Sequence, residues 1–297
     1  MRLSYAIVDV FAEQPLQGNA AAVVFDADGL DAARMQAIAR EFNLSETAFV
    51  LKPRDAGHAA RVRLFVPTAE VPFAGHPNIA TAFALARRQT LATDDLVFDE
   101  LAGLVPLRLT RVKGAVTGAM LTAPQRLSTV PGPAAAAVAA ALSLDAGDVV
   151  TATHPPITAS VGLGFLFVEL TDNAALARAR VSLPAFDAIR ASHDVEAVHL
   201  YVKQATAGGA RIQARNLSPY DGIGEDPATG SATATLAALL AQCDPRADLD
   251  FALEARQGLE MGRPSLLHAT ARKRNGQVVP PQVSGKCVQV MEGTISL

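Results

Sequence analysis

Two segments of the chain place acidic and small residues together in patterns that suit proton transfer. The segment Gly224 to Ser231 reads GEDPATGS and holds two neighbouring carboxylates, Glu225 and Asp226, ahead of a Gly-Ser pair. The segment AGHP places His76 directly after Gly75. A carboxylate in an enclosed apolar site has its pKa raised, and a histidine titrates near neutral pH, so both can exchange protons with a substrate. The chemistry that these residue types predict is general acid–base catalysis.

A third carboxylate, Glu46, lies in the segment NLSETAFV, where a helix is expected to lead into a strand. Each candidate also has a structural interpretation. Glu46 could end a helix in solvent, Asp226 before a proline could form an Asx turn, and His76 could be a hydrogen-bonded structural residue. Glu225, and Glu196 at the position that we match to Glu46 in the second half, are expected to be exposed.

The candidates fall in two stretches of the chain that resemble each other. Residues 60–86 and 210–241 both begin Ala-Arg plus a β-branched residue and alternate like a strand. Both then pass through a Pro and Gly region and end in an Ala/Leu helix. Gly75 aligns with Gly230, and the residue after each glycine is His in the first copy and Ser in the second. The second copy is expected to carry a short insertion before its glycine, and that insertion would bring the two acids.

The elements upstream repeat as well, which predicts a duplicated domain. A helix leads into a strand at residues 30–51 and again at 183–202. Several strand pairs read as hairpins, so an α+β fold is favoured over a doubly wound sheet. We expect two similar halves related by pseudo-two-fold symmetry, each a central apolar helix wrapped by a mixed β-sheet. The predicted halves are residues 1–125 and 126–285, and residues 286–297 form a strand that could pair back onto the first half.

Each repeat predicts a helix that is apolar on every face, and such a helix belongs in a core. The first N–H groups of a helix lack intrahelical partners and favour an anion, and Gly75 and Gly230 would let one approach the backbone. If the halves pack face to face, both helix starts would meet in one cleft that binds a carboxylate. The alternative is that the glycines only permit helix entry, with Asn78 and Ser231 as ordinary capping residues.

Composition and motifs exclude several other classes of protein. The 297 residues are 50% hydrophobic with a net charge of -3, which gives no reason to expect a nucleic acid or an anionic membrane as partner. Two cysteines and no signal-like or membrane-length apolar segment lead us to expect a cytoplasmic protein. Neither a phosphate-binding loop nor a zinc motif is present, so neither a nucleotide-phosphate site nor a metal site is expected. A Ser-His-Asp hydrolase would lack its nucleophile elbow, and a two-thiol racemase would lack a cysteine at each helix start.

Four motifs, NLSETAFV, PFAGHPNIATA, GEDPATGSA and QGLEMGRPSL, together resemble the PhzF family of phenazine-biosynthesis isomerase-like proteins. The resemblance runs from Val8 to the end of the chain. It implies a diaminopimelate-epimerase-like fold with the active site between two similar halves, no cofactor, and a homodimer. It also implies a cofactor-independent isomerase that moves a proton on a small cyclic or amino-acid-like carboxylate.

The resemblance assigns a role to each matching residue. The family's acid/base falls on Glu46, and its aspartate and histidine fall on Asp226 and His76. The expected substrate-binding positions are Gly75, Gly230, Ser231 and Asn19. Fold-level analogy does not fix the substrate. A racemase or epimerase of a small amino acid, and a non-catalytic protein that binds small carboxylates, therefore remain alternatives.

Overall fold

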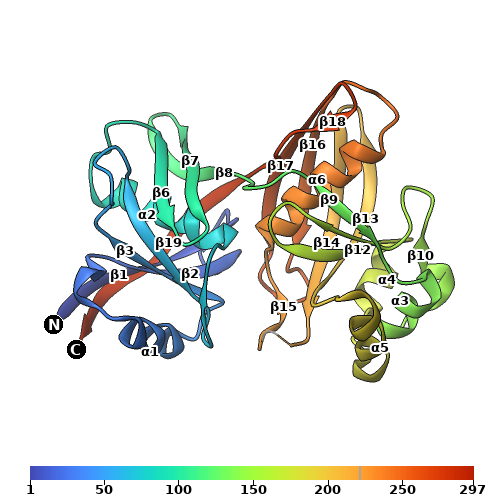
Figure 1. Cartoon of the computed structure of the whole chain (residues 1–297), viewed down its shortest axis with the longest axis horizontal. Helices are drawn as coiled ribbons and strands as arrows, with labels where there is room; N and C mark the ends of the chain where they lie inside the picture. Colours follow the sequence, from blue (N-terminus) through green and yellow to red (C-terminus); the bar gives the residue numbers. More distant parts are fainter. Residues whose placement is uncertain (221) are drawn as a thin grey trace. The chain divides into compact units, whose positions relative to one another are not determined.

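The computed structural model describes residues 1–220 and 222–297, and these form two compact units. Unit 1 comprises Met1–Thr122 and Ser284–Leu297, and unit 2 comprises Ala123–Val283 (Figure 1). Unit 1 is therefore built from both ends of the chain. No helix within the described residues is long and apolar enough to cross a membrane.

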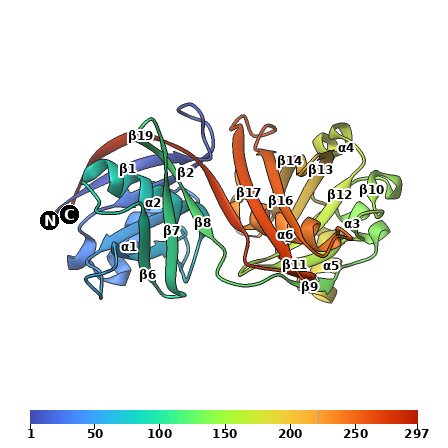
Figure 2. The ribbon, with the colours of Figure 1, turned by 90° about the horizontal axis from the view of Figure 1, so that it is seen from above.

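Unit 1 is a mixed sheet with one helix on its outer face and one helix that is almost fully buried. Strand β2 pairs antiparallel with β1 and parallel with β3, and β4 pairs antiparallel with β3 and parallel with β6. The last strand pairs antiparallel with the first, as Figure 2 shows. The elements are β1 (Arg2–Val10), β2 (Asn19–Val24), α1 (Ala32–Phe42), β3 (Glu46–Leu51), β4 (Ala60–Phe65), β5 (Glu70–Val71), α2 (Gly75–Arg88), β6 (Asp95–Glu100), β7 (Gly103–Val112), β8 (Ala115–Thr122) and β19 (Gln282–Ser296).

The two helices of unit 1 differ in what they bury. The side chain of Asp31 caps α1 by accepting a hydrogen bond from the backbone N–H of Arg34, and only one face of α1 packs on the sheet. Helix α2 buries ten consecutive residues, from His76 to Leu85, and contacts β1, β2, β3, β7 and β8. A helix that is enclosed in this way has no solvent face to carry charge, which is why its sequence lacks the polar stripe of α1.

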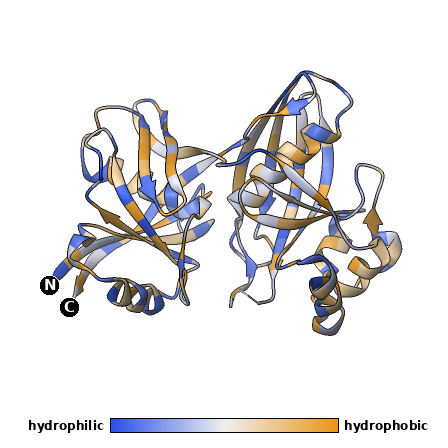
Figure 3. Ribbon diagram, in the orientation of Figure 1, coloured by the Kyte–Doolittle hydropathy of each residue, from blue (hydrophilic) through white to orange (hydrophobic). Residues whose placement is uncertain are grey.

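Unit 2 likewise combines parallel and antiparallel strand pairs, with three helices on one face and a buried helix that contacts β11, β12, β16, β17 and β18. The ribbon of this buried helix, α6, is orange to pale over most of its length in Figure 3, whereas α1 carries blue turns. The elements are β9 (Ser128–Pro131), α3 (Ala135–Ala141), β10 (Val149–Val150), β11 (Ile157–Ser160), β12 (Gly164–Leu170), α4 (Asn173–Arg178), α5 (Leu183–His193), β13 (Val198–Thr206), β14 (Gly209–Ser218), β15 (Gly224–Asp226), α6 (Gly230–Cys243), β16 (Leu249–Gln257), β17 (Ser265–Arg274) and β18 (Gln277–Val278).

The hairpins before the two buried helices have the same strand register. This corrects the expected position of the insertion in the second copy. Strands β4 and β5 pair Phe65 with Glu70, and β14 and β15 pair Leu217 with Glu225. Each of these glutamates lies five residues before the first residue of its helix. The extra residues of the second copy therefore lie inside its hairpin loop, and Glu225 and Asp226 occupy the positions of Glu70 and Val71.

Candidate active site

In unit 1, the structure brings Glu46 and His76 together. Glu46 is the first residue of β3, and its side chain is 19% exposed rather than in open solvent. His76 is the second residue of α2 and is buried. The imidazole Nε2 lies 3.4 Å from the Glu46 Oε2. A carboxylate beside an imidazole at a helix start is an arrangement that can accept and return a proton.

Asn19 is linked to the segment of Glu46 by a hydrogen bond from Ser45, the residue before Glu46. It begins β2, is 2% exposed, and its Oδ1 accepts a hydrogen bond of 3.4 Å from the Ser45 hydroxyl. Strand β2 pairs with β3 so that Ala21 is opposite Glu46. Parallel pairing of β2 and β3 is thus what sets Asn19 near the acid.

The two glycines at the helix starts have ordinary helical backbones. Gly75 and Gly230 are the first residues of α2 and α6, and neither is among the residues with positive φ. Their small size, rather than left-handed geometry, is the property that could matter to a ligand.

Asn78 and Ser231 are not the capping residues of these helices, contrary to the structural alternative above. The residues at the N-cap positions are Ala74 and Thr229, and neither caps its helix with a side chain. The Asn78 amide instead donates to the Ala74 carbonyl at 2.9 Å, one turn back within α2. Ser231 is the second residue of α6, where its carbonyl accepts a bond from the Thr235 hydroxyl.

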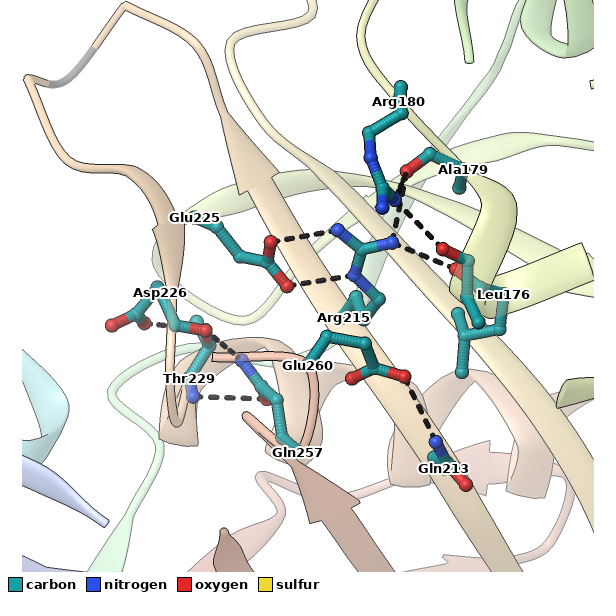
Figure 4. Close-up of polar contacts among 11 residues, drawn as sticks. Leu176, Ala179, Arg180, Gln213, Arg215, Glu225, Asp226, Thr229, Gln257 and Glu260 are labelled. Carbon is teal, nitrogen blue, oxygen red and sulfur yellow. Dashed lines mark hydrogen bonds and ion pairs between the residues drawn. The ribbon is translucent and has the colours of Figure 1, made fainter. Parts of the chain in front are cut away.

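Asp226 ends β15, directly before the turn that leads into α6 (Figure 4). Its Oδ2 accepts a 2.6 Å hydrogen bond from the Thr229 hydroxyl, and its carbonyl accepts a 2.7 Å bond from the Gln257 amide. The aspartate therefore does form a local turn contact, which the sequence allowed as its structural interpretation. A turn-forming role and a chemical role are compatible, because the carboxylate is only half-buried.

Glu225 is not the exposed residue that the sequence led us to expect. Its two oxygens accept bonds of 2.8 Å each from Nε and Nη2 of Arg215, whose side chain is buried. Glu196 is exposed and pairs with Arg190, as expected. The register shows, however, that Ala197 rather than Glu196 occupies the position of Glu46. Thr47 pairs with Phe65 and Val198 pairs with Leu217, and these two partners hold matching positions, so the residues before Thr47 and Val198 match as well.

Two buried polar residues near the helix starts were not predicted. Gln257 ends β16 and is fully buried, and Glu100 ends β6 and is 8% exposed. Burial raises the pKa of Glu100 to about 8, and the Asn78 amide opposes this only in part. Gln257 lies in the motif QGLEMGRPSL, so a signal was present, but an amide carries no chemistry that marks it as functional.

Among the described residues, no group of three or more His, Cys, Asp or Glu side chains could hold a metal ion. The candidate positions are instead carboxylates, an imidazole and helix starts. The backbone N–H groups at the helix starts suit an organic anion, and the carboxylates and the imidazole can exchange protons.

Comparison with known proteins first defines the fold. The structure matches a PhzF-family protein from Bacillus anthracis with a TM-score of 0.87 at 23% identity, covering 100% of both chains. It matches a predicted epimerase from Pseudomonas aeruginosa with a TM-score of 0.77 at 30% identity over 99% of both chains. A hydroxyproline epimerase from Agrobacterium vitis gives a TM-score of 0.60 at 13% identity, covering 100% of this chain and 93% of that one. The class is an epimerase-like α+β fold with mixed sheets.

The family follows from the sequence comparisons. The model of the PhzC-PhzF family, described as phenazine biosynthesis-like protein, matches residues 8–293. The chain is 39% identical to the trans-2,3-dihydro-3-hydroxyanthranilate isomerase of Pseudomonas chlororaphis over 99% of both proteins. It is 31% identical to the uncharacterized isomerase YddE of Escherichia coli strain K12, over 95% of this chain and 94% of that protein. The chain belongs to the PhzC-PhzF family, which confirms the resemblance and the class of PhzF-like isomerase.

Proposed function

We propose that this protein is a cofactor-independent isomerase that moves a proton by carboxylate acid–base chemistry on a small cyclic or amino-acid-like carboxylate. The observation that carries the proposal is the Glu46 carboxylate 3.4 Å from the buried His76 imidazole, at the start of a buried helix. An isomerisation conserves all atoms and electrons, so one group that takes a proton from one carbon and returns it to another is sufficient.

The remaining candidates take binding and supporting roles in this proposal. Glu46 removes and returns the proton, and His76 orients the carboxylate. Asp226 assists proton handling, while the helix starts at Gly75 and Gly230 bind the substrate carboxylate through backbone N–H groups. Ser231 and Asn19 complete the polar surroundings of the substrate.

The duplicated architecture belongs to the same proposal. We infer that the two units are copies of one ancestral unit with a central helix wrapped by a mixed sheet. The equal register of the hairpins before α2 and α6 supports this. The acids are not duplicated, since Glu46 corresponds to Ala197 and Asp226 to Val71. Single acids at non-equivalent positions favour a proton moved along a substrate over the paired bases of a racemase.

The proposal is tested by incubating the protein in deuterated water with trans-2,3-dihydro-3-hydroxyanthranilate, the compound in the names of its relatives, and with a panel of amino acids. We expect isomerisation of the cyclic compound with deuterium at the new C–H position, detected by mass spectrometry and NMR. The Glu46→Gln variant serves as the matched control and should give neither. Deuterium at the Cα of an amino acid would instead identify a racemase, and silence across the panel with retained carboxylate binding would identify a binding protein.

A further inference from the structure

The side chain of Gln257 reaches the turn that carries Asp226 from the neighbouring strand β16 (Figure 4). Its Nε2 donates to the carbonyl of Asp226 at 2.7 Å and to the hydroxyl oxygen of Thr229 at 2.9 Å. Its Oε1 accepts the backbone N–H of Thr229 at 3.2 Å. Both ends of this fully buried amide are thus bonded to the segment from Asp226 to Thr229, which joins β15 to α6.

The contact with Thr229 also fixes the side chain of Asp226. A hydroxyl has a single hydrogen, and its oxygen can accept while that hydrogen is donated elsewhere. Because the Thr229 oxygen accepts from Gln257, its hydrogen is directed to the Asp226 Oδ2, at 2.6 Å. Gln257 therefore determines both the main-chain position of Asp226 and the direction of a hydrogen bond to its carboxylate.

A second contact holds the other side of the same aspartate. Glu225, the residue before Asp226, forms the two-bond pair with Arg215, and Nη1 of that arginine donates to the carbonyls of Leu176 and Ala179 at 2.9 Å each. Figure 4 shows this guanidinium joining the hairpin to the helix α4 region. Asp226 is consequently fixed from both directions along the chain.

Unit 1 has the ion pair but lacks the amide. Arg63 donates to Glu70 at 2.7 and 2.6 Å, at the positions that match Arg215 and Glu225. This pair is thus common to both units, whether or not the hairpin carries an acid like Asp226.

The residue that matches Gln257 is identified by the parallel pairing of the strands. Phe65 and Leu217 hold matching positions in their hairpins, and Ala60 and Ile212 lie five residues before them. Ala60 pairs with Phe98, and Ile212 pairs with Ala255. Two residues beyond these partners stand Glu100 and Gln257. Unit 1 has Val71 where unit 2 has Asp226, and a carboxyl where unit 2 has the amide. The amide therefore accompanies the acid.

We propose that Gln257 is a positioning residue for the isomerase reaction, which fixes Asp226 and the first turn of α6 through Thr229. This rests on the proposed function, in which Asp226 handles the proton. Misplacement of a reacting group by about 1 Å costs on the order of 100-fold in rate.

The test compares Gln257→Met, which keeps the length of the side chain and removes its hydrogen bonds, with Gln213→Met. The amide of Gln213 donates to Glu260 in the turn after β16, and it is not the amide that bonds Asp226 and Thr229, so its variant is the matched control. We expect Gln257→Met to lower kcat about 10- to 100-fold with KM changed less than about threefold. Hydrogen exchange at the Thr229 amide should become at least about tenfold faster, because its acceptor is lost. The control should change neither quantity.

A background that lacks the aspartate separates positioning from mere support of the fold. In Asp226→Asn, adding Gln257→Met should lower kcat less than about twofold, because the group that Gln257 positions is already gone. An equal loss of kcat in both backgrounds, or unchanged exchange at Thr229 in Gln257→Met, would overturn the proposal. If the wild-type protein shows no turnover, the proposed function fails. The Thr229 exchange rates then still decide whether Gln257 holds the turn.

Discussion

Replacing Glu100 by glutamine is expected to stabilise the protein at neutral and alkaline pH. Burial at the end of β6 raises the pKa of Glu100 from its ordinary 4.5 to about 8. Between these values the folded protein keeps a proton that the unfolded chain releases. The free energy of unfolding therefore falls as pH rises, by up to about 1.4 kcal/mol per pH unit.

The size of the effect follows from the width of this window. Below pH 4.5 both states are protonated and Glu100 costs nothing. At pH 7 the cost has reached about 3 kcal/mol, and above pH 8 it is complete at about 5 kcal/mol. Glutamine has the same shape and does not titrate. The Glu100→Gln variant should thus lose this pH dependence and melt about 5 °C above wild type at pH 7.

The measurement is a series of thermal melts from pH 4.5 to pH 9 for wild type and variant. The neighbouring Asp99→Asn is the control with the opposite sign. The backbone N–H of Arg54 and then the His58 ring lower the pKa of Asp99, so its contribution to stability is present at neutral pH and lost in acid. Asp99→Asn should accordingly destabilise at neutral pH. If the melting temperatures of wild type and Glu100→Gln changed with pH in parallel across the whole range, a buried, neutral Glu100 would be refuted.

Three further outcomes are expected. Glu46→Gln should lower turnover by about 10²–10⁴-fold and leave ligand affinity nearly intact, because it removes only the proton acceptor; near-wild-type activity would remove Glu46 from the mechanism. Treatment with EDTA should change neither activity nor melting temperature, and a loss that one added metal restores would contradict this. Gly230→Val should weaken the binding of small carboxylates, measured by titration, more than it lowers the melting temperature. Gly230 is helical and has no positive φ, so its backbone angles do not require glycine, and a folded variant that binds as tightly as wild type would exclude the anion-binding role.

The sequence indicated that α2 and α6 would be largely buried, because neither has the polar stripe of a helix with a solvent face. The register of the repeats was less accessible. Strands of similar apolar composition can be aligned one residue out, as the match of Glu196 to Glu46 was. Only the pairing of β14 with β15 shows that the extra residues lie in the hairpin loop.

Long-range polar contacts were the other part that the sequence did not reveal. Glu225 was expected in solvent because its partner, Arg215, lies ten residues away across a hairpin whose register was unknown. Gln257 was passed over because its significance depends entirely on which turn it reaches. The family and the isomerase class are confirmed, while the roles of the individual site residues, the absence of a cofactor, the homodimer and the cytoplasmic location stay predictions.

The pairing of β1 with β19 has a consequence for how the chain folds. Unit 2 is continuous in sequence, but the first strand of unit 1 has one of its two partners, β19, on the far side of unit 2 in the chain. Contacts of such large sequence separation slow folding, so unit 2 can form from a continuous segment while unit 1 is complete only when β19 has paired. The backbone N–H of Leu297 donates to the carbonyl of Met1 at 2.8 Å, so the two ends lie together. A circular permutant that joined these ends and opened the chain at Ala123 would make both units continuous and would release unit 1 from this delay.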